Sequence, residues 1–72
     1  MQINYEYIKE LLTKNNIPYT YPSLGSFLIQ SKANEVIFYP KIKKLVINKI
    51  PKQHNTLNEC LLELKGLLHN DV

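Results

Sequence analysis

Side chains able to do acid–base, nucleophilic or metal chemistry are few and scattered in this chain of 72 residues. Cys60 is the only cysteine, so an internal disulfide and a cysteine-based zinc cluster are excluded, and its place among leucines favours a buried thiol over a nucleophile. His54 and His69 lie at opposite ends of one expected helix, too far apart to share a metal ion. The carboxylates are dispersed, and no glycine-rich phosphate loop exists. We therefore expect no enzyme, no cofactor and no metal site.

The uneven feature of the sequence is its positive charge. The formal net charge is +3, the nine basic residues are all lysines, and six of them fall between positions 32 and 52, where Glu35 is the only acid. These six are Lys32, Lys41, Lys43, Lys44, Lys49 and Lys52. Such a surface suits nucleic-acid phosphates or an acidic protein, and Tyr39 is a candidate for stacking on a base. The alternative is a solvated surface that discourages strand-to-strand aggregation.

Two stretches rich in β-branched and aromatic residues, 36–39 and 45–47, predict an antiparallel ribbon in the middle of the chain. Pro40 has the backbone preference of a turn residue, so we place the turn at Pro40–Lys43. Directly opposed residues then share a face of the sheet. The expected pairs are Tyr39 with Lys44, Phe38 with Leu45, Ile37 with Val46 and Val36 with Ile47.

A third strand over Phe27–Gln30, joined through a turn at 31–34, extends this ribbon into a three-stranded meander. Counting residues back from this turn places Phe27 opposite Phe38 and Ile29 opposite Val36. Both turns therefore predict the same apolar core face. The opposite face then holds Leu28, Ile37, Tyr39, Lys44 and Val46.

One helix is expected before the meander in the sequence and another after it. Asn4 can cap a helix from Tyr5 to about Asn15, and Thr56-Leu57-Asn58-Glu59 is a capping box that opens a leucine-striped helix ending near residues 69–70. Residues 19–21 form either a short fourth strand, which Pro22 would stop, or an ordered loop. Residues 48–55 form a polar connector, in which Pro51 ends the last strand.

These elements predict one α+β domain spanning residues 1–72, an α-β-β-β-α two-layer sandwich with both helices on one sheet face. The other face is left with an apolar patch of the kind that marks interfaces, formed by Leu28, Ile37, Tyr39 and Val46. No stretch has the length of a membrane span and the N-terminus lacks the features of a signal peptide, so we expect a cytoplasmic protein with no membrane partner.

Two resemblances follow from this arrangement. The α-β-β-β-α order resembles the double-stranded RNA-binding domain, a family that places a lysine-rich motif at the start of its second helix over RNA phosphates. The matching segment, 52–58, carries one lysine and one histidine. The run Phe38-Tyr39-Pro40-Lys41-Ile42-Lys43-Lys44 is similar to hairpins in small proteins of bacteriophages and mobile elements, and this similarity implies an accessory or host-interaction protein.

The sequence therefore predicts a small non-enzymatic binding module that contacts nucleic acid through the lysine-rich ribbon. The alternative is a protein-binding inhibitor or regulator of a host protein, for example a defence protein, which uses the open sheet face. A homodimer that uses the same face on itself is a third alternative.

Overall fold

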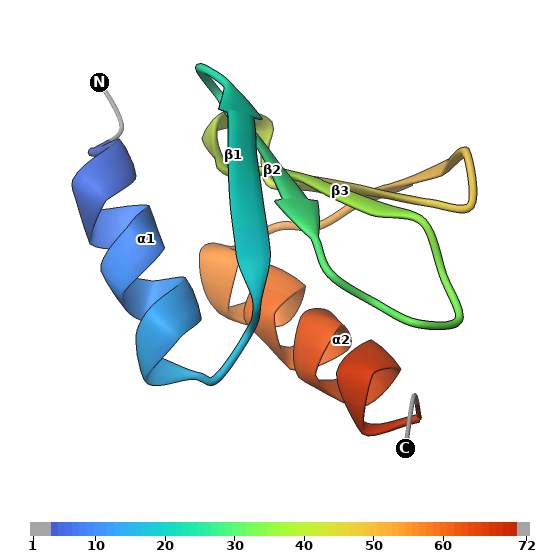
Figure 1. Ribbon diagram of the computed structural model, residues 1–72. Coiled ribbons are helices and arrows are strands. Elements are labelled where there is room, and N and C mark those ends of the chain that lie inside the picture. The colour runs from blue at the N-terminus through green and yellow to red at the C-terminus, as the bar shows by residue number, and fades with distance from the viewer. Residues whose placement is uncertain (1–3, 71–72) are drawn as a thin grey trace.

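The computed structural model describes residues 4–70, which form an α+β fold with one antiparallel sheet and two helices (Figure 1). The elements in chain order are α1 (Tyr5–Lys14), β1 (Tyr19–Ser23), β2 (Ser26–Ile29), β3 (Val36–Tyr39), the 3-10 turn η1 (Pro40–Ile42), β4 (Lys44–Ile47), β5 (Ile50–Gln53) and α2 (Leu57–His69). Consecutive strands are neighbours throughout, so the sheet is a five-stranded meander in the order β1-β2-β3-β4-β5. Both helices lie on one face of this sheet, as the apolar pattern predicted.

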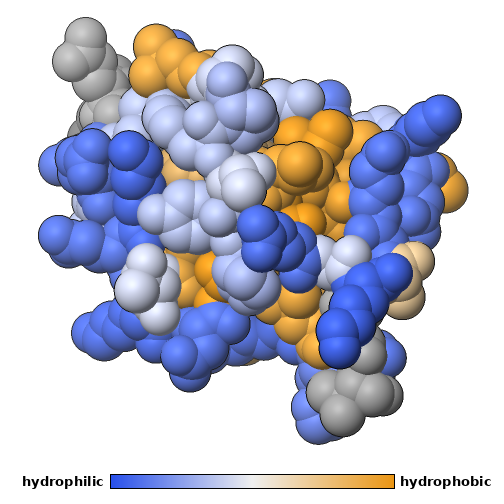
Figure 2. Space-filling view, viewed as in Figure 1, coloured by the Kyte–Doolittle hydropathy of each residue, from blue (hydrophilic) through white to orange (hydrophobic). Residues whose placement is uncertain are grey.

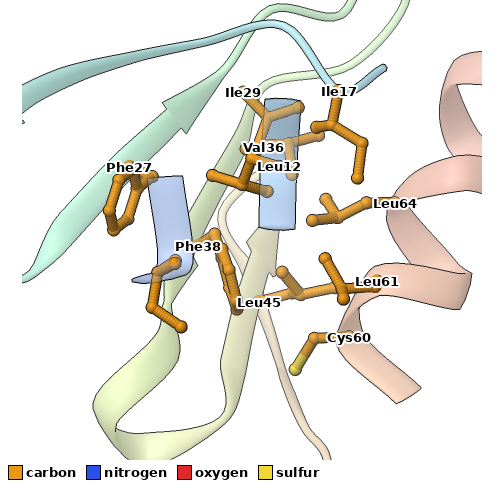
Figure 3. Close-up of a cluster of buried hydrophobic side chains, with 11 residues drawn as sticks. Leu12, Ile17, Phe27, Ile29, Val36, Phe38, Leu45, Cys60, Leu61 and Leu64 are labelled. Carbon is orange, nitrogen blue, oxygen red and sulfur yellow. The ribbon is translucent and has the colours of Figure 1, made fainter. Parts of the chain in front are cut away.

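The hydrophobic core lies between the sheet and the two helices (Figure 3). Helix α1 contributes Ile8 and Leu12, and α2 contributes Cys60, Leu61 and Leu64. The strands add Phe27, Ile29, Val36, Phe38 and Leu45, all of them buried. The core face expected from the two turns is therefore confirmed.

The register of the three central strands is also the predicted one. Phe38 pairs with Leu45 and Tyr39 with Lys44 across the β3–β4 turn, and Phe27 pairs with Phe38 across β2–β3. The turn itself ends at Lys43, which takes the left-handed conformation with φ of 54°. Its amide donates to the carbonyl of Pro40 at 3.2 Å, which closes the turn.

The expected strand number was wrong, because the segment interpreted as a polar connector contains a fifth strand, β5. Residues Asn48 and Lys49 form a two-residue turn in which both φ angles are positive, 52° and 70°. This is the backbone geometry that returns a strand on its neighbour in a tight hairpin. Pro51 therefore lies inside a strand rather than after one, opposite Val46. A proline is tolerated there because β5 is the edge of the sheet.

Residues 19–21, left open between strand and loop, belong to the other edge strand, β1. Pro22 does not stop this strand, because the pairing with β2 shifts between Thr20 and Ser23 and the chain continues past it. Irregular pairing at an edge is where a sheet accepts proline.

Both predicted helix caps are present. Oδ1 of Asn4 accepts hydrogen bonds from the amides of Glu6 and Tyr7 at 3.0 and 3.3 Å. At α2, the Thr56 hydroxyl accepts from the Glu59 amide at 3.1 Å, and the Glu59 carboxylate accepts from the Thr56 amide at 3.1 Å. These caps fix where each helix begins, and so fix which residues face the sheet.

Candidate interaction surface

The sheet face opposite the helices carries one continuous row of side chains across all five strands. Each member of the row is paired directly with the next one: Thr20, Leu28, Ile37, Val46 and Pro51. Leu28 is 40% exposed, Pro51 is exposed, and Ile37 and Val46 are half-buried. No helix among residues 4–70 covers this row, because α1 and α2 both pack on the other face. We call this row the open-face row.

The open-face row forms an apolar band, and a more polar row lies along its side toward the β3–β4 turn. Figure 2 shows hydrophobic surface to the right of the paler residues of β1, bordered by hydrophilic side chains. Toward the β3–β4 turn, a second paired row holds Tyr39, Lys44 and Gln53. Nε2 of Gln53 donates to the carbonyl oxygens of Ile42 and Lys43 at 2.6 and 3.3 Å, which fastens the edge strand to the turn. These hydrogen bonds fix the position of β5, and with it the β5 end of the apolar band.

The lysines predicted to form one nucleic-acid surface lie in three places. Lys41 and Lys43 are exposed in the β3–β4 turn, with Lys44 beside them on the open face. Lys49 is in the β4–β5 turn and Lys32 in the β2–β3 connection, and these two lie at the other end of the meander. Strands of four residues separate the two ends by about 13 Å. The charge thus flanks the open-face row along its two long sides, toward the two ends of the strands.

The sixth lysine points to the helix side. Lys52 pairs with Leu45, a core residue, and its Nζ lies 2.9 Å from Oε2 of Glu63 on α2. The other oxygen of this carboxylate lies 2.8 Å from Nε2 of His54. That nitrogen is buried and makes no hydrogen bond of good geometry, so the contact is a close approach of a carboxylate and an imidazole. Glu63 thereby joins the end of β5 to α2, and Lys52 is separated from the other five lysines.

Cys60, the side chain first considered as a nucleophile, lies in the hydrophobic core. Cys60 is 0% exposed, and its burial, followed by the nearby Glu59 and Glu63 carboxylates, raises the pKa of its thiol to about 11. A thiol of this kind is protonated and inaccessible at neutral pH, which makes it a poor nucleophile. Within residues 4–70, no three histidine, cysteine or acidic side chains are grouped closely enough to hold a metal ion.

Tyr19 and Tyr21 on β1 are part of the core edge. The Tyr21 ring lies 4.6 Å from that of Phe27 between centroids, and the Tyr19 ring lies 5.5 Å from it, edge to face. The ammonium group of Lys9 lies 4.6 Å from the Tyr21 ring centroid. These rings seal one side of the core, so Tyr39 is the tyrosine that accompanies the open-face row.

Sequence reasoning missed several members of this surface. Thr20 and Pro51 complete the row at its two edges, and both depend on strands that the sequence left open or did not predict. The signal for Pro51 was the two-residue spacer between Ile47 and Ile50, which suits a tight hairpin. Leu24 and Ile42 are 82% and 52% exposed in the two turns at the Lys41 end, and they line one shallow pocket with Tyr39. Their exposure could not be read from a pattern that expects polar turn residues.

No protein-family model, curated protein or solved structure matches this chain. None of the helices formed by residues 4–70 is long and apolar enough to cross a membrane.

Proposed function

We propose that this protein is a non-enzymatic binding module that captures a partner protein on its open sheet face. The observation that carries the proposal is the open-face row, a paired band of mainly apolar side chains that no helix of the described chain covers. An apolar band of this kind on a small domain is typical of an interaction site, because leaving it in water costs free energy that a partner recovers.

The placement of the lysines favours a protein partner over the nucleic acid that the sequence suggested first. A nucleic-acid surface needs cations along one track of phosphates. Here Lys52 is paired with Glu63 on the helix side, and the other five divide between two ends with an apolar band between them. An amphipathic protein surface matches such a pattern better than the uniformly charged phosphate backbone of a nucleic acid does.

A host protein is the partner class we propose, in agreement with the resemblance of residues 38–44 to hairpins of phage and mobile-element proteins. The test is a pull-down from host lysate at low and high salt, with and without nuclease. Wild type should retain one protein under all four conditions, and Ile37→Asp should lose it. Leu62→Asp is the matched control, since Leu62 is an exposed apolar residue of α2, outside the open face. Equal retention by Ile37→Asp and wild type would overturn the proposal.

Nucleic-acid binding stays a second candidate on one specific observation, the pairing of Tyr39 with Lys44 on the open face beside Lys41 and Lys43. An aromatic ring next to cations can stack a base while the lysines bind phosphates. Three such lysines predict that log K falls by about 2 per tenfold rise in salt for a single strand. A fluorescent oligonucleotide titration measures this slope, and Lys41→Glu with Lys43→Glu should abolish binding. Absence of binding at low salt would remove this candidate.

A further inference from the structure

We infer that the open-face row binds an acidic amphipathic helix of the partner, which completes a third layer over the sheet. This inference rests on the proposed protein-binding function and names the chemistry of its ligand. Three observations support the choice of a helix over other occupants: the size of the face, the character of its two edges and the distribution of charge around it.

The size of the open face matches one helix. Strands of four residues give it a length of about 13 Å, and the spacing across five strands gives a width of roughly 20 Å. An α-helix with its side chains is about 10–12 Å thick, and three turns are about 16 Å long. The resulting area, on the order of 300 Å², falls well below the ~800 Å² per partner of a stable dimer. A stable dimer would therefore have to bury surface well beyond this face, whereas a single helix fills it.

The edges of the sheet are unsuited to a partner strand. On β5, the amide of His54 donates to the carbonyl of Lys43 at 2.8 Å. Because ladder bonds alternate along an antiparallel strand, Pro51 then has its nitrogen on the outer side, where it offers no donor. On β1, Pro22 lies in the irregular stretch between Thr20 and Ser23. A partner that added a strand would meet a proline at either edge, so binding across the face is favoured.

The charge around the face selects an acidic ligand. Lys41, Lys43 and Lys44 lie along one side of the apolar row, and Lys32 and Lys49 lie along the other, together with the acid Glu35. Two copies of this face would bring lysines against lysines, which opposes self-association. A helix that lies along the row with an apolar stripe bordered by Asp and Glu places opposite charge against the lysines on both sides. Such complementarity speeds encounter and fixes orientation more than it adds affinity.

The test is selection of random 16-residue peptides displayed on phage against the immobilised protein, with depletion on the empty support. Selected peptides should be negatively charged, repeat apolar residues at i, i+3, i+4 and i+7, and gain helical circular dichroism on binding. Each should bind Ile37→Asp and Leu28→Asp at least about tenfold more weakly than wild type, a loss of about 1.4 kcal/mol. Binding to Leu62→Asp should match wild type. Leu28 is 40% exposed, so Leu28→Asp should leave the fold intact. It therefore tests the same face even if Ile37→Asp unfolds the protein.

Other outcomes contradict the inference. Basic peptides, peptides without a helical period, or no enrichment over the depleted pool would each overturn it. If lysate pull-down gives a protein that depends on Ile37 while selection gives no acidic helices, only the inference fails. If neither experiment depends on Ile37, the proposed function fails with it. Selection of peptides that bind as strands would assign the surface to sheet extension instead.

Discussion

Truncation of Phe27 to alanine should remove a large share of the stability of this protein. Phe27 is 0% exposed, and its ring lies among four others. The rings of Tyr5, Tyr19, Tyr21 and Phe38 have centroids 6.4, 5.5, 4.6 and 6.2 Å from it. Helix α1, the edge strand β1 and the central strand β3 therefore meet on this side chain. Its loss leaves a cavity between three elements that cannot close independently.

The size of the effect follows from this packing. Truncating a buried phenylalanine costs about 3–5 kcal/mol, from lost transfer free energy and the residual cavity. The folded state of a 72-residue chain is stable by about 4–11 kcal/mol in total. Phe27→Ala should therefore remove roughly half of the free energy of unfolding. Phe27→Leu, which keeps apolar volume but loses the ring contacts, should cost less.

Urea denaturation followed by far-UV circular dichroism measures the effect, with the m-value as a check on two-state behaviour. Leu24→Ala is the matched control, three residues away in the same hairpin, where the side chain is 82% exposed. It should change stability by no more than about 0.5 kcal/mol. A cost below about 1 kcal/mol for Phe27→Ala, at an unchanged m-value, would refute the view that this ring organises the core.

Three further predictions concern α2 and its contacts. Thr56→Ala should cost about 1 kcal/mol in urea denaturation, because it removes the cap of α2, and an unchanged midpoint would contradict the capping box. Cys60 should react with a maleimide at pH 8 only as fast as the protein unfolds. Its pKa is raised, so the unfolded thiol ionises first and stability should fall from about pH 9 to about pH 11, a slope that Cys60→Ala should reduce. Rapid native labelling would show an exposed thiol instead. Glu63→Ala should speed hydrogen exchange at the His54 amide while lowering global stability by less than about 1 kcal/mol, since Lys52 is more than half exposed. Unchanged exchange would mean that Glu63 does not hold β5.

The centre of the fold was predictable because two independent signals agreed there. Pro40 located one turn, and the apolar alternation of 36–39 against 45–47 then admitted a single register. Phe27 and Ile29 joined the same core face without adjustment. The open face followed from this register, since the residues between the core positions must point away from it. Leu28, Ile37 and Val46 were therefore placed correctly.

The edges of the sheet were less predictable because a lysine takes a left-handed conformation in the β4–β5 turn and a proline lies inside β5. Lys49 takes φ of 70°, a conformation usually supplied by glycine, so the β4–β5 turn had no familiar dipeptide signal. Hydrogen bonds hold this turn instead: the Asn48 side chain accepts from the Glu35 amide and donates to Oδ1 of Asn34, both at 2.9 Å. With β5 missing from the expectation, the pairing of Lys52 with Glu63 could not be foreseen.

The measurement that tests the central claim most directly is chemical-shift mapping of the isotope-labelled protein with the partner that wild type retains. The amides of Leu28, Ile37 and Val46 should show the largest changes, with smaller ones at Lys41 and Lys44. Changes confined to the outer surfaces of α1 and α2 would contradict the claim that the open sheet face is the binding surface.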